Sequence, residues 1–449
     1  MDAALLRKYN VPGPRYTSYP AVPHWTEVPT RDAWKDHVSD AFARSNSAQG
    51  ISLYVHLPYC ESLCTYCGCN TRITVNHAVE MPYIQAVLAE WRLYKRLFNA
   101  PPRIRELHLG GGTPTFFSPE HLQALVEGLM EDATFTDDAE IGFEGHPHST
   151  TTAHLRKLYD LGARRVSIGI QDFDPRVQAV INRVQSFGEV QRVFDEARRT
   201  GYTSINADLI YGLPLQNERS IRLTMDRTLA LRPDRIAFYG YAHVPWVRPG
   251  QRRYTESDLP SGEAKRALYE LGRAMLEDGG YVEVGMDHFA LPDEALARAM
   301  RKGTLHRNFM GYTPVRTELL IGLGVSSISD SWTCYAQNVK VVEDYLKEVA
   351  ADELPVMRGH VLSPEDLQVR EAVLDLMCRF HTDLASLGWD AARCAVELAG
   401  LRMDGIVELD GTEVTVTEEG RACVRNVCMA IDPRMEREEL QRPVFSRTI

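Results

Sequence analysis

The chain has 449 residues, 44% of them hydrophobic and 25% charged, and its acidic residues exceed the basic ones by 61 − 50 = 11. At about 100 to 200 residues per domain this length allows two to four domains, and the composition excludes a disordered or fibrous protein. The acidic excess argues against nucleic acid as the main partner, because proteins that bind nucleic acid concentrate positive charge.

Residues 1–49 are predicted to form an extended N-terminal arm. Pro12, Pro14 and Pro20 alternate there with glycine and tyrosine, and proline disfavours a helical conformation in the residue before it. The apolar stretch before Arg7 is too short for a signal peptide, and the chain nowhere approaches the about 18 consecutive apolar residues of a membrane span. We therefore expect a cytoplasmic protein that has no membrane partner and acts as a monomer.

A repeat of short apolar runs, polar turns and longer segments with helical spacing begins near residue 50 and predicts successive βα units. The predicted strands are Ile51–Leu57, Ile104–Leu109, Glu140–Glu144, Arg165–Ile170, Ser204–Ile210 and Arg235–Tyr241. The predicted helices are Val79–Phe98, Pro119–Glu131, Thr152–Leu161, Phe187–Thr200 and Glu218–Ala230. Right-handed crossovers would curl such a parallel sheet into a full or partial barrel, and a flat doubly wound sheet is the alternative.

Polar residues or glycines follow each predicted strand. In barrel-like α/β folds the catalytic residues gather at the carboxyl ends of the strands. The residues at these ends are His56, Gly110-Gly111-Gly112-Thr113, Glu144, Gln171-Asp172, Asp208 and Tyr241-Ala242-His243. Potential ligands at every end favour one shared functional site over unrelated turn residues.

The pattern changes after residue 360. We expect residues 50–360 to form the catalytic domain and residues 361–449 to form a smaller C-terminal domain. The predicted elements of this smaller domain are the helices Glu365–Phe380 and Trp389–Leu398 and the strands Ile406–Leu409 and Glu413–Thr417. Asp410-Gly411 between the two strands is a strong hairpin signal, so the domain is predicted to be winged-helix-like. Its acidic residues favour a role in packing or in covering the substrate over DNA binding.

The cysteines carry the sharpest signal. Four of the nine, Cys60, Cys64, Cys67 and Cys69, lie close together, and thiolates spaced C-x3-C-x2-C on one loop can each bind a different iron of an iron–sulfur cluster. A zinc site is the alternative, but zinc normally takes four ligands in two separated pairs, and no second C-x2-C pair exists. A cluster with three protein ligands leaves one iron open, as catalysis requires.

This loop, placed after the first predicted strand, resembles that of the radical S-adenosylmethionine (SAM) superfamily. The resemblance implies a [4Fe-4S] cluster on Cys60, Cys64 and Cys67 whose open iron chelates SAM. It also implies reductive cleavage of SAM to a 5′-deoxyadenosyl radical that abstracts hydrogen from the substrate. Gly110-Gly111-Gly112-Thr113 resembles the glycine motif that meets the SAM amino group, and Tyr66 matches an aromatic residue near adenine.

A second resemblance extends over nearly the whole chain. It is carried by Arg15-Tyr16-Thr17-Ser18-Tyr19-Pro20, Cys67-Gly68-Cys69-Asn70, Gln171-Asp172-Phe173, Asp208-Leu209-Ile210-Tyr211-Gly212-Leu213-Pro214, Gly285-Met286-Asp287-His288-Phe289-Ala290, His306-Arg307-Asn308-Phe309, Cys334-Tyr335-Ala336-Gln337-Asn338 and Arg425-Asn426-Val427-Cys428-Met429. These motifs resemble the oxygen-independent coproporphyrinogen III oxidases, which decarboxylate the ring A and B propionates of coproporphyrinogen III to vinyls and yield protoporphyrinogen IX in haem synthesis. The implied fold is α/β: a radical SAM partial (β/α)6 barrel with an N-terminal arm and a winged-helix-like α+β domain.

The resemblance also implies roles for individual residues. Cys60, Cys64 and Cys67 would bind the cluster, and Cys69 and Glu144 would be catalytic. The residues implied to contact one or other of two SAM molecules are Tyr54, Tyr66, Gly111, Gly112, Thr113, Glu144, Gln171, Arg183, Asp208, Ala242 and Ile328. The candidate substrate contacts are Arg15, Tyr16, Arg307 and Phe309. The implied partners are coproporphyrinogen III and a low-potential electron donor such as flavodoxin or ferredoxin.

One segment departs from the family pattern, and two other functions stay open. Gly145-His146-Pro147-His148 follows Glu144 where an Asp-Pro-Arg type sequence is expected, and for His146 and His148 a solvated loop is favoured over substrate contact. A related haem chaperone generally lacks Cys69 and the arm motif, and both are present here. A haem-degrading radical SAM methyltransferase would also bind porphyrin and SAM.

Overall fold

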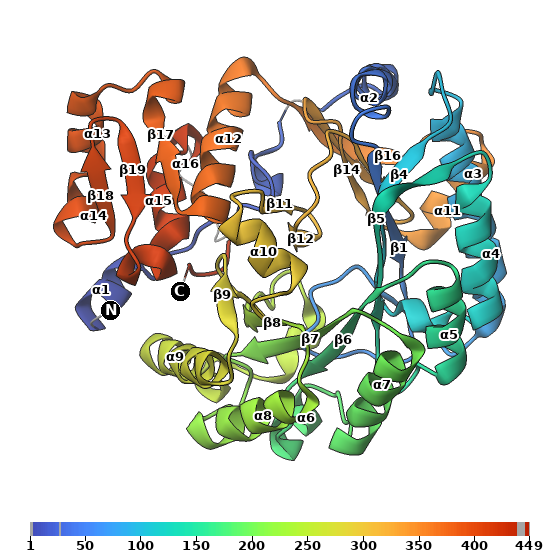
Figure 1. Cartoon of the computed structure of the whole chain (residues 1–449), viewed down its shortest axis with the longest axis horizontal. Coiled ribbons are helices and arrows are strands. Elements are labelled where there is room, and N and C mark those ends of the chain that lie inside the picture. Colours follow the sequence, from blue (N-terminus) through green and yellow to red (C-terminus); the bar gives the residue numbers. More distant parts are fainter. Residues whose placement is uncertain (1–2, 27, 438–444, 449) are drawn as a thin grey trace.

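The computed structural model describes residues 3–26, 28–437 and 445–448, and a curved sheet of 12 strands forms its centre (Figure 1). In spatial order the strands are β16 (Val356–Val361), β15 (Cys334–Asn338), β14 (Ile328–Asp330), β13 (Leu320–Leu323), β1 (Ile51–Leu57), β4 (Arg103–Gly111), β5 (Thr134–Gly145), β6 (Arg165–Gln171), β7 (Ser204–Tyr211), β8 (Arg235–Gly240), β10 (His288–Ala290) and β9 (Val282–Val284). Neighbours from β13 to β8 are parallel, and the pairs at both ends are antiparallel.

The strands from β1 through β4 to β8 confirm the predicted parallel sheet. Their residues are buried on both faces, as in β1, where only Tyr54 of seven residues is less than fully buried, so the strands read as continuous apolar runs. The helices α3 (Glu80–Lys95), α4 (Pro119–Met130), α5 (Thr152–Asp160), α7 (Phe187–Thr200) and α8 (Glu218–Leu231) lie on the outer side of the curved sheet (Figure 1). The fold is therefore a partial barrel, and the flat doubly wound alternative is wrong.

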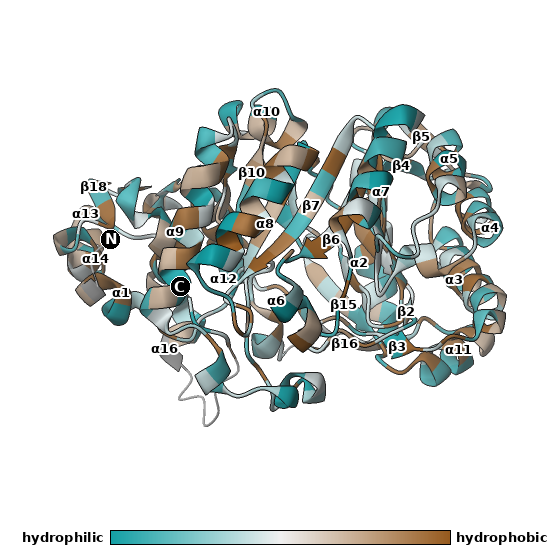
Figure 2. Ribbon diagram, turned by 90° about the horizontal axis from the view of Figure 1, so that it is seen from below, coloured by the Kyte–Doolittle hydropathy of each residue, from teal (hydrophilic) through white to brown (hydrophobic). Residues whose placement is uncertain are grey.

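Polar side chains fix where these outer helices begin. Ser118, Thr151, Ser186 and Asn217 each accept a hydrogen bond from a backbone N–H in the first turn of the following helix. Such a cap contributes about 1 kcal/mol to helix stability. Hydrophilic residues gather on the outer turns of α4, α5 and α7 in Figure 2, while their apolar residues join the core against the sheet.

Several elements were not predicted. They are α6 (Pro175–Val180), α9 (Gly262–Asp278), α10 (Ala295–Arg301), α11 (Val342–Ala350), the short pair β2 (Tyr59–Cys60) and β3 (Arg72–Ile73), and the hairpin β11 (His306–Asn308) with β12 (Gly311–Thr313). Strands β13 to β16 extend the sheet beyond β1, on the side opposite to β8. The short strands among these elements, of only two to four residues, are too short to show a periodicity.

The C-terminal region has the predicted winged-helix-like form. It contains α12 (Pro364–Arg379), β17 (His381–Asp383), α13 (Ala391–Glu397), α14 (Ala399–Met403), β18 (Val407–Asp410), β19 (Glu413–Val416), α15 (Val424–Ala430) and α16 (Pro433–Arg437). Its strands form a three-stranded antiparallel sheet in the order β17-β19-β18. Gly411 turns the hairpin at φ 62°, a left-handed conformation that glycine adopts at little cost.

The N-terminal segment is only partly the extended arm that we predicted. Helices α1 (Ala3–Tyr9) and α2 (Arg31–Ser45) flank it, and only the described residues between them are largely extended. Tyr16 and Tyr19 of this arm are 2% exposed and pack in one core with the C-terminal region. The prediction missed α2, although Trp34, Val38 and Phe42 have the four-residue spacing of one helix face and Thr30 caps the helix.

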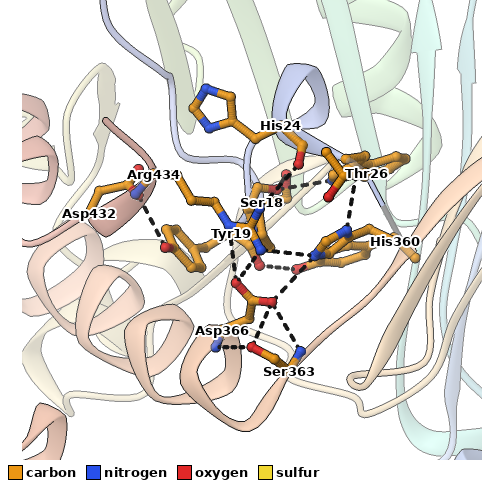
Figure 3. Close-up of polar contacts among 12 residues, drawn as sticks. Ser18, Tyr19, His24, Thr26, His360, Ser363, Asp366, Asp432 and Arg434 are labelled. Atoms are coloured by element: carbon orange, nitrogen blue, oxygen red, sulfur yellow. Dashed lines mark hydrogen bonds and ion pairs between the residues drawn. The ribbon is translucent and has the colours of Figure 1, made fainter. Parts of the chain in front are cut away.

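Hydrogen bonds tie the arm to the C-terminal region. The Tyr16 and Tyr19 hydroxyls donate to the Asp432 carboxylate over 3.0 and 3.1 Å. Arg434 donates to Asp366 over 2.8 Å, and Figure 3 shows this pair beside Tyr19. Asp432 is 2% exposed, so the two tyrosines supply the hydrogen bonds that its carboxylate needs in the interior.

Deleting residues 1–20 is therefore expected to lower the melting temperature by about 5 °C or more, because it strips tyrosines from a core and leaves a buried carboxylate without its donors. Thermal unfolding followed by circular dichroism measures this. Tyr16→Phe, which keeps the ring and loses one hydroxyl, is the milder comparison, with a loss of about 1 kcal/mol. A truncated protein as stable as the full chain would show that the arm is not part of this core.

Candidate active site

A cavity of about 510 Å³ opens at the carboxyl ends of the parallel strands and brings together most of the predicted site residues. Those that line it are Cys60, Cys64, Tyr66, Cys67, Cys69, Gly111, Gly112, Thr113, Glu144, Gln171, Arg183 and Asp208. They come from the loop after β1 and from the ends of β4 to β7, which is where catalytic residues gather in such folds.

The cysteine loop runs from β2 to β3 and is held by neighbouring backbone. Thr65 N–H donates to Ile181 O over 2.9 Å, and the Asn182 side chain donates to Leu63 O over 2.8 Å. Thr113 N–H donates to Tyr59 O over 3.0 Å. The loop is thus fixed from α6 on one side and from the glycine motif on the other.

The thiols of Cys60, Cys64 and Cys67 are free and half-buried beside the cavity. Arg183 donates to Cys64 Sγ over 3.6 Å, and a hydrogen bond from Cys69 lowers the pKa of the Cys67 thiol to about 6 although burial opposes this. Burial raises the pKa of the Cys60 thiol to about 11. The thiolate is the form that binds metal, so the loop favours the state that a cluster requires at Cys67.

No group of three or more His, Cys, Asp or Glu side chains in the described part of the chain converges on a point where one metal ion would sit. A zinc site needs such convergence, because its four ligands surround a single ion at about 2.0 to 2.3 Å. Thiols that bind separate irons of a cluster need not converge in this way. The three free thiols on one loop are a donor set that fits an iron–sulfur cluster.

Glu144 lies at the end of β5 and points into the cavity, with 41% of its side chain exposed. Its carboxylate accepts hydrogen bonds from Gly111 N–H over 3.2 Å and from His108 Nε2 over 3.4 Å. Burial raises its pKa, but the bonds from His108 and Gly111 outweigh this and lower it below the usual value. Gly110 must lack a side chain here, because a Cβ would lie 2.9 Å from Glu144 Oε1. An ionised carboxylate is thereby presented to a cationic ligand.

Asp208, Gln171 and Arg183 form the opposite wall. Ser167 Oγ donates to the Asp208 carboxylate over 2.7 Å, and burial raises the pKa of Asp208 to about 6. Gln171 adopts φ 69°, a left-handed conformation that is uncommon outside glycine and is often found at functional sites. Arg183 is buried, and its Nε has no hydrogen-bond partner among the described residues. This N–H of the guanidinium is therefore available to donate to a ligand.

The other predicted residues lie elsewhere. Tyr54 is behind the glycine motif, where its hydroxyl is 3.1 Å from His56 Nδ1. Ala242 and Arg15 line a second cavity, and Ile328 lies in β14.

Arg307 stacks 4.4 Å above the Tyr312 ring, which lines the first cavity. Tyr16 and Phe309 do not line either of these cavities, since Tyr16 is in the C-terminal core and Phe309 packs on Trp25 and Tyr335.

The cavity also contains residues that the sequence analysis did not assign. They are His108, Arg165, Asn206, Tyr239, His288 and Tyr312. His108 and Asn206 stand two residues before a strand-end residue, so the alternation along a strand could have identified them. His146, expected in a solvated loop, is instead half-buried on the cavity wall, and burial with the charge of Arg183 lowers its pKa to about 3.

The model of the radical SAM superfamily matches residues 54–228, which contain the cysteine loop and the strand ends just described. The fold and the site together therefore define a radical SAM protein. Proteins of this superfamily use a [4Fe-4S] cluster and SAM.

Curated relatives narrow the class. The chain is 39% identical to the oxygen-independent coproporphyrinogen III oxidase of Escherichia coli, over 100% of this chain and 98% of that protein. It is 37% identical to the proteins of the same name from Synechocystis and from Pseudomonas aeruginosa, each over 100% of this chain and 98% of the relative. The chain belongs to the family of oxygen-independent coproporphyrinogen III oxidases.

A solved structure agrees. The coproporphyrinogen III oxidase of Escherichia coli, described as a radical SAM enzyme, superposes with a TM-score of 0.89 at 36% identity, over 96% of this chain and 99% of that one. The partial barrel and the added C-terminal region are thus both family features.

Proposed function

We propose that this chain converts coproporphyrinogen III to protoporphyrinogen IX without oxygen, by oxidative decarboxylation of the ring A and B propionates to vinyls. The observation that carries the proposal is one cavity in which the three thiols of the C-x3-C-x2-C loop face Glu144, within a chain similar over its full length to enzymes of that name. When bound, the cluster and SAM supply a 5′-deoxyadenosyl radical that abstracts hydrogen from the substrate.

The residues of the chain bind and orient these groups. Cys60, Cys64 and Cys67 would hold the cluster and leave one iron open. Glu144, kept ionised by its hydrogen bonds, would accept from the ammonium group of SAM, while the spare donor of Arg183 suits a carboxylate.

The proposal includes a second SAM molecule. Gln171, Arg183 and Asp208 face the same cavity as Glu144, and Ala242 lines the neighbouring one. Tyr54, Tyr66, Gly111, Gly112, Thr113 and Ile328 complete the proposed SAM contacts. Equilibrium binding of SAM to the cluster-loaded protein, with two molecules per chain expected, tests this.

We further propose a division into an arm (1–49), a catalytic domain (50–360) and a C-terminal domain (361–449), acting as a cytoplasmic monomer with flavodoxin or ferredoxin as electron donor and without nucleic acid or membrane. Among the described residues, no helix is long and apolar enough to cross a bilayer. The donor can be tested by replacing dithionite with reduced flavodoxin or ferredoxin in the assay.

The function is tested with anaerobically reconstituted protein, coproporphyrinogen III, SAM and a reductant. We expect protoporphyrinogen IX and 5′-deoxyadenosine, with no product when SAM is left out. A haem chaperone would bind haem without forming vinyls, and a haem-degrading methyltransferase would consume haem and methylate it. Either result in place of decarboxylation would contradict the proposal.

Reconstituted protein is expected to bind about four irons and four sulfides per chain, since three thiolates on one loop hold a cubane cluster. Iron and sulfide analysis with electron paramagnetic resonance measures this. Exposure to oxygen should destroy the cluster, because one iron has no protein ligand. Stoichiometric zinc with no cluster signal would refute the assignment.

Glu144→Gln is expected to weaken SAM binding about tenfold or more while the cluster remains intact, because a neutral amide cannot balance an ammonium group as a carboxylate does. SAM affinity and 5′-deoxyadenosine formed with dithionite are the measurements. The cluster spectrum is the internal control. Unchanged affinity and cleavage would remove Glu144 from the SAM site.

A further inference from the structure

A second cavity, of about 1280 Å³, lies next to the first. Its walls come from the N-terminal arm, the ends of β7 and β8, α9 and the C-terminal region, which surround this side of the barrel in Figure 1. Gly240 and Asp287 line it, whereas their sequence neighbours Tyr239 and His288 line the first cavity. The two cavities therefore lie side by side along the end of β8 and residues 287 and 288.

Among the cationic residues that line this second cavity, three come from three different parts of the chain. Arg15 comes from the arm, Lys265 from α9 and Arg425 from α15. Arg15 donates to Gly240 O over 2.9 Å, and Lys265 donates to Tyr241 O over 3.1 Å.

Arg425 is 4% exposed, and it too is bonded to backbone carbonyls: it donates to Pro14 O over 2.7 Å and also to the carbonyls of Gly13, Arg447 and Thr448. Within the described part of the chain, no ion pair joins Arg15, Lys265 or Arg425 to a carboxylate. Arg425 is buried and Arg15 and Lys265 are half-buried, and a cation in such a position normally has an acidic partner, so three on one cavity without one among the described residues are unusual.

The three charges also repel one another. Burial, followed by the charges of Arg15 and Arg425, lowers the pKa of Lys265 to about 8. Burial and Arg15 likewise lower the pKa of Arg425 to about 9. A fold gains no stability from such an arrangement, and sites of this kind are retained where function requires them.

Of the acidic residues on the cavity wall, four are already bonded elsewhere, and Glu256, Glu418 and Glu419 form no ion pair with Arg15, Lys265 or Arg425 among the described residues. Asp287 lies 2.7 Å from His288 Nδ1, and Glu263 pairs with Arg7. Glu270 pairs with Arg266 and Arg273, and Glu283 accepts from the Tyr269 hydroxyl. The positive potential of Arg15, Lys265 and Arg425 is therefore left for a ligand.

We propose that Arg15, Lys265 and Arg425 form a binding site for the propionate carboxylates of the porphyrinogen that are not at the reacting position, an inference that rests on the proposed function. The ligand carries four carboxylates on a large apolar macrocycle. The cavity exceeds the about 300 to 1000 Å³ of usual ligand pockets and has aromatic walls at Tyr211, Tyr241 and Tyr269. One propionate could then enter the first cavity while others are held in the second.

Lys265→Met is the variant that tests the site, because Arg425 also holds the arm and its loss could unfold the protein. The probe is coproporphyrin III, the stable oxidised tetracarboxylate, added anaerobically to cluster-loaded protein and followed by quenching of tryptophan fluorescence. We expect about tenfold weaker binding than in the unmodified protein, as for the loss of one charge-assisted hydrogen bond. Lys265→Arg should restore most of the affinity.

Three controls test whether the weaker binding comes from the lost charge at this site. The tetramethyl ester of coproporphyrin III should bind equally to both proteins, since it lacks the charges. Lys302→Met, at an exposed position at the end of α10, should leave coproporphyrin binding unchanged. The melting temperature of Lys265→Met should be equal to or higher than that of the unmodified protein, because one repelling charge is gone; a merely structural lysine would lower it.

SAM also carries a carboxylate, so SAM affinity is measured in the same variant and should not change. Unaltered coproporphyrin affinity in Lys265→Met would overturn the proposal, and so would a loss confined to SAM. Conversion of coproporphyrinogen III by the unmodified protein is assayed alongside. If that conversion fails, the proposed function is wrong. If the conversion succeeds but the variant and the unmodified protein bind coproporphyrin III equally well, only the proposed carboxylate site is wrong.

Discussion

Cys64→Ala is expected to abolish cluster binding and, with it, all formation of protoporphyrinogen IX. With Cys64 removed only two of the three ligand thiolates remain, and two thiolates hold a cubane cluster too weakly for it to persist. The same loss is expected for Cys60→Ala and Cys67→Ala. Iron content, the cluster spectrum and product formation after anaerobic reconstitution are the measurements.

The control is Cys394→Ala, a buried cysteine of α13 in the C-terminal region. It removes one thiol without touching the loop, so iron content should stay at about four per chain and activity should follow protein stability alone. Retention of a full cluster in Cys64→Ala would show that this thiol is not a ligand.

The sequence predicted the barrel well because most of its strands are buried on both faces. A run such as Ile51–Leu57 shows continuous hydrophobicity between polar turns, and the following helices begin at residues such as Ser118 and Ser186 that cap them. These are local signals, visible without knowledge of the tertiary structure. The length of the strands was underestimated, as at β5, because its first residues are exposed and polar.

Tertiary contacts decided what could not be predicted. Tyr16 of the arm was a candidate substrate contact, yet Tyr16 and Tyr19 belong to the core of the C-terminal region, where their hydroxyls donate to Asp432. A pairing between residues more than 400 positions apart leaves no local pattern in either segment. Prolines in the arm indicate its extended shape but not what it packs against.

Residues of the site were likewise predictable only where a local pattern in the sequence marks them. Cys60 and Glu144 could be found because both stand at strand ends, the positions at which barrels carry their chemistry. Arg425 could not, since it comes from a helix of the C-terminal region and reaches the second cavity only when the whole chain is folded. The loop sequence predicted that His146 is solvated. In the structure His146 is half-buried near Arg183, and nothing in the loop sequence indicates this contact.

Cys69 is the position where sequence alone leaves two opposite interpretations. It stands two residues after Cys67 and could be mistaken for a fourth cluster ligand. Its thiol lines the first cavity on an exposed residue, and its backbone N–H lies 3.4 Å from Cys67 Sγ. A fourth thiolate on the cluster would occupy the iron that SAM must chelate, so we assign Cys69 to the substrate side of the site.

Cys69→Ser is accordingly expected to keep the cluster spectrum, SAM binding and 5′-deoxyadenosine formation while vinyl formation falls by about 100-fold, the range for loss of a group that moves a proton in the reaction. The serine retains the backbone contact to Cys67, so the loop itself should not change. If Cys69 only packs in the loop, turnover of the variant would stay near normal. If Cys69 were a fourth cluster ligand, the variant would lose the cluster. The ratio of protoporphyrinogen IX to 5′-deoxyadenosine, measured on the same sample as the cluster spectrum, separates these three outcomes.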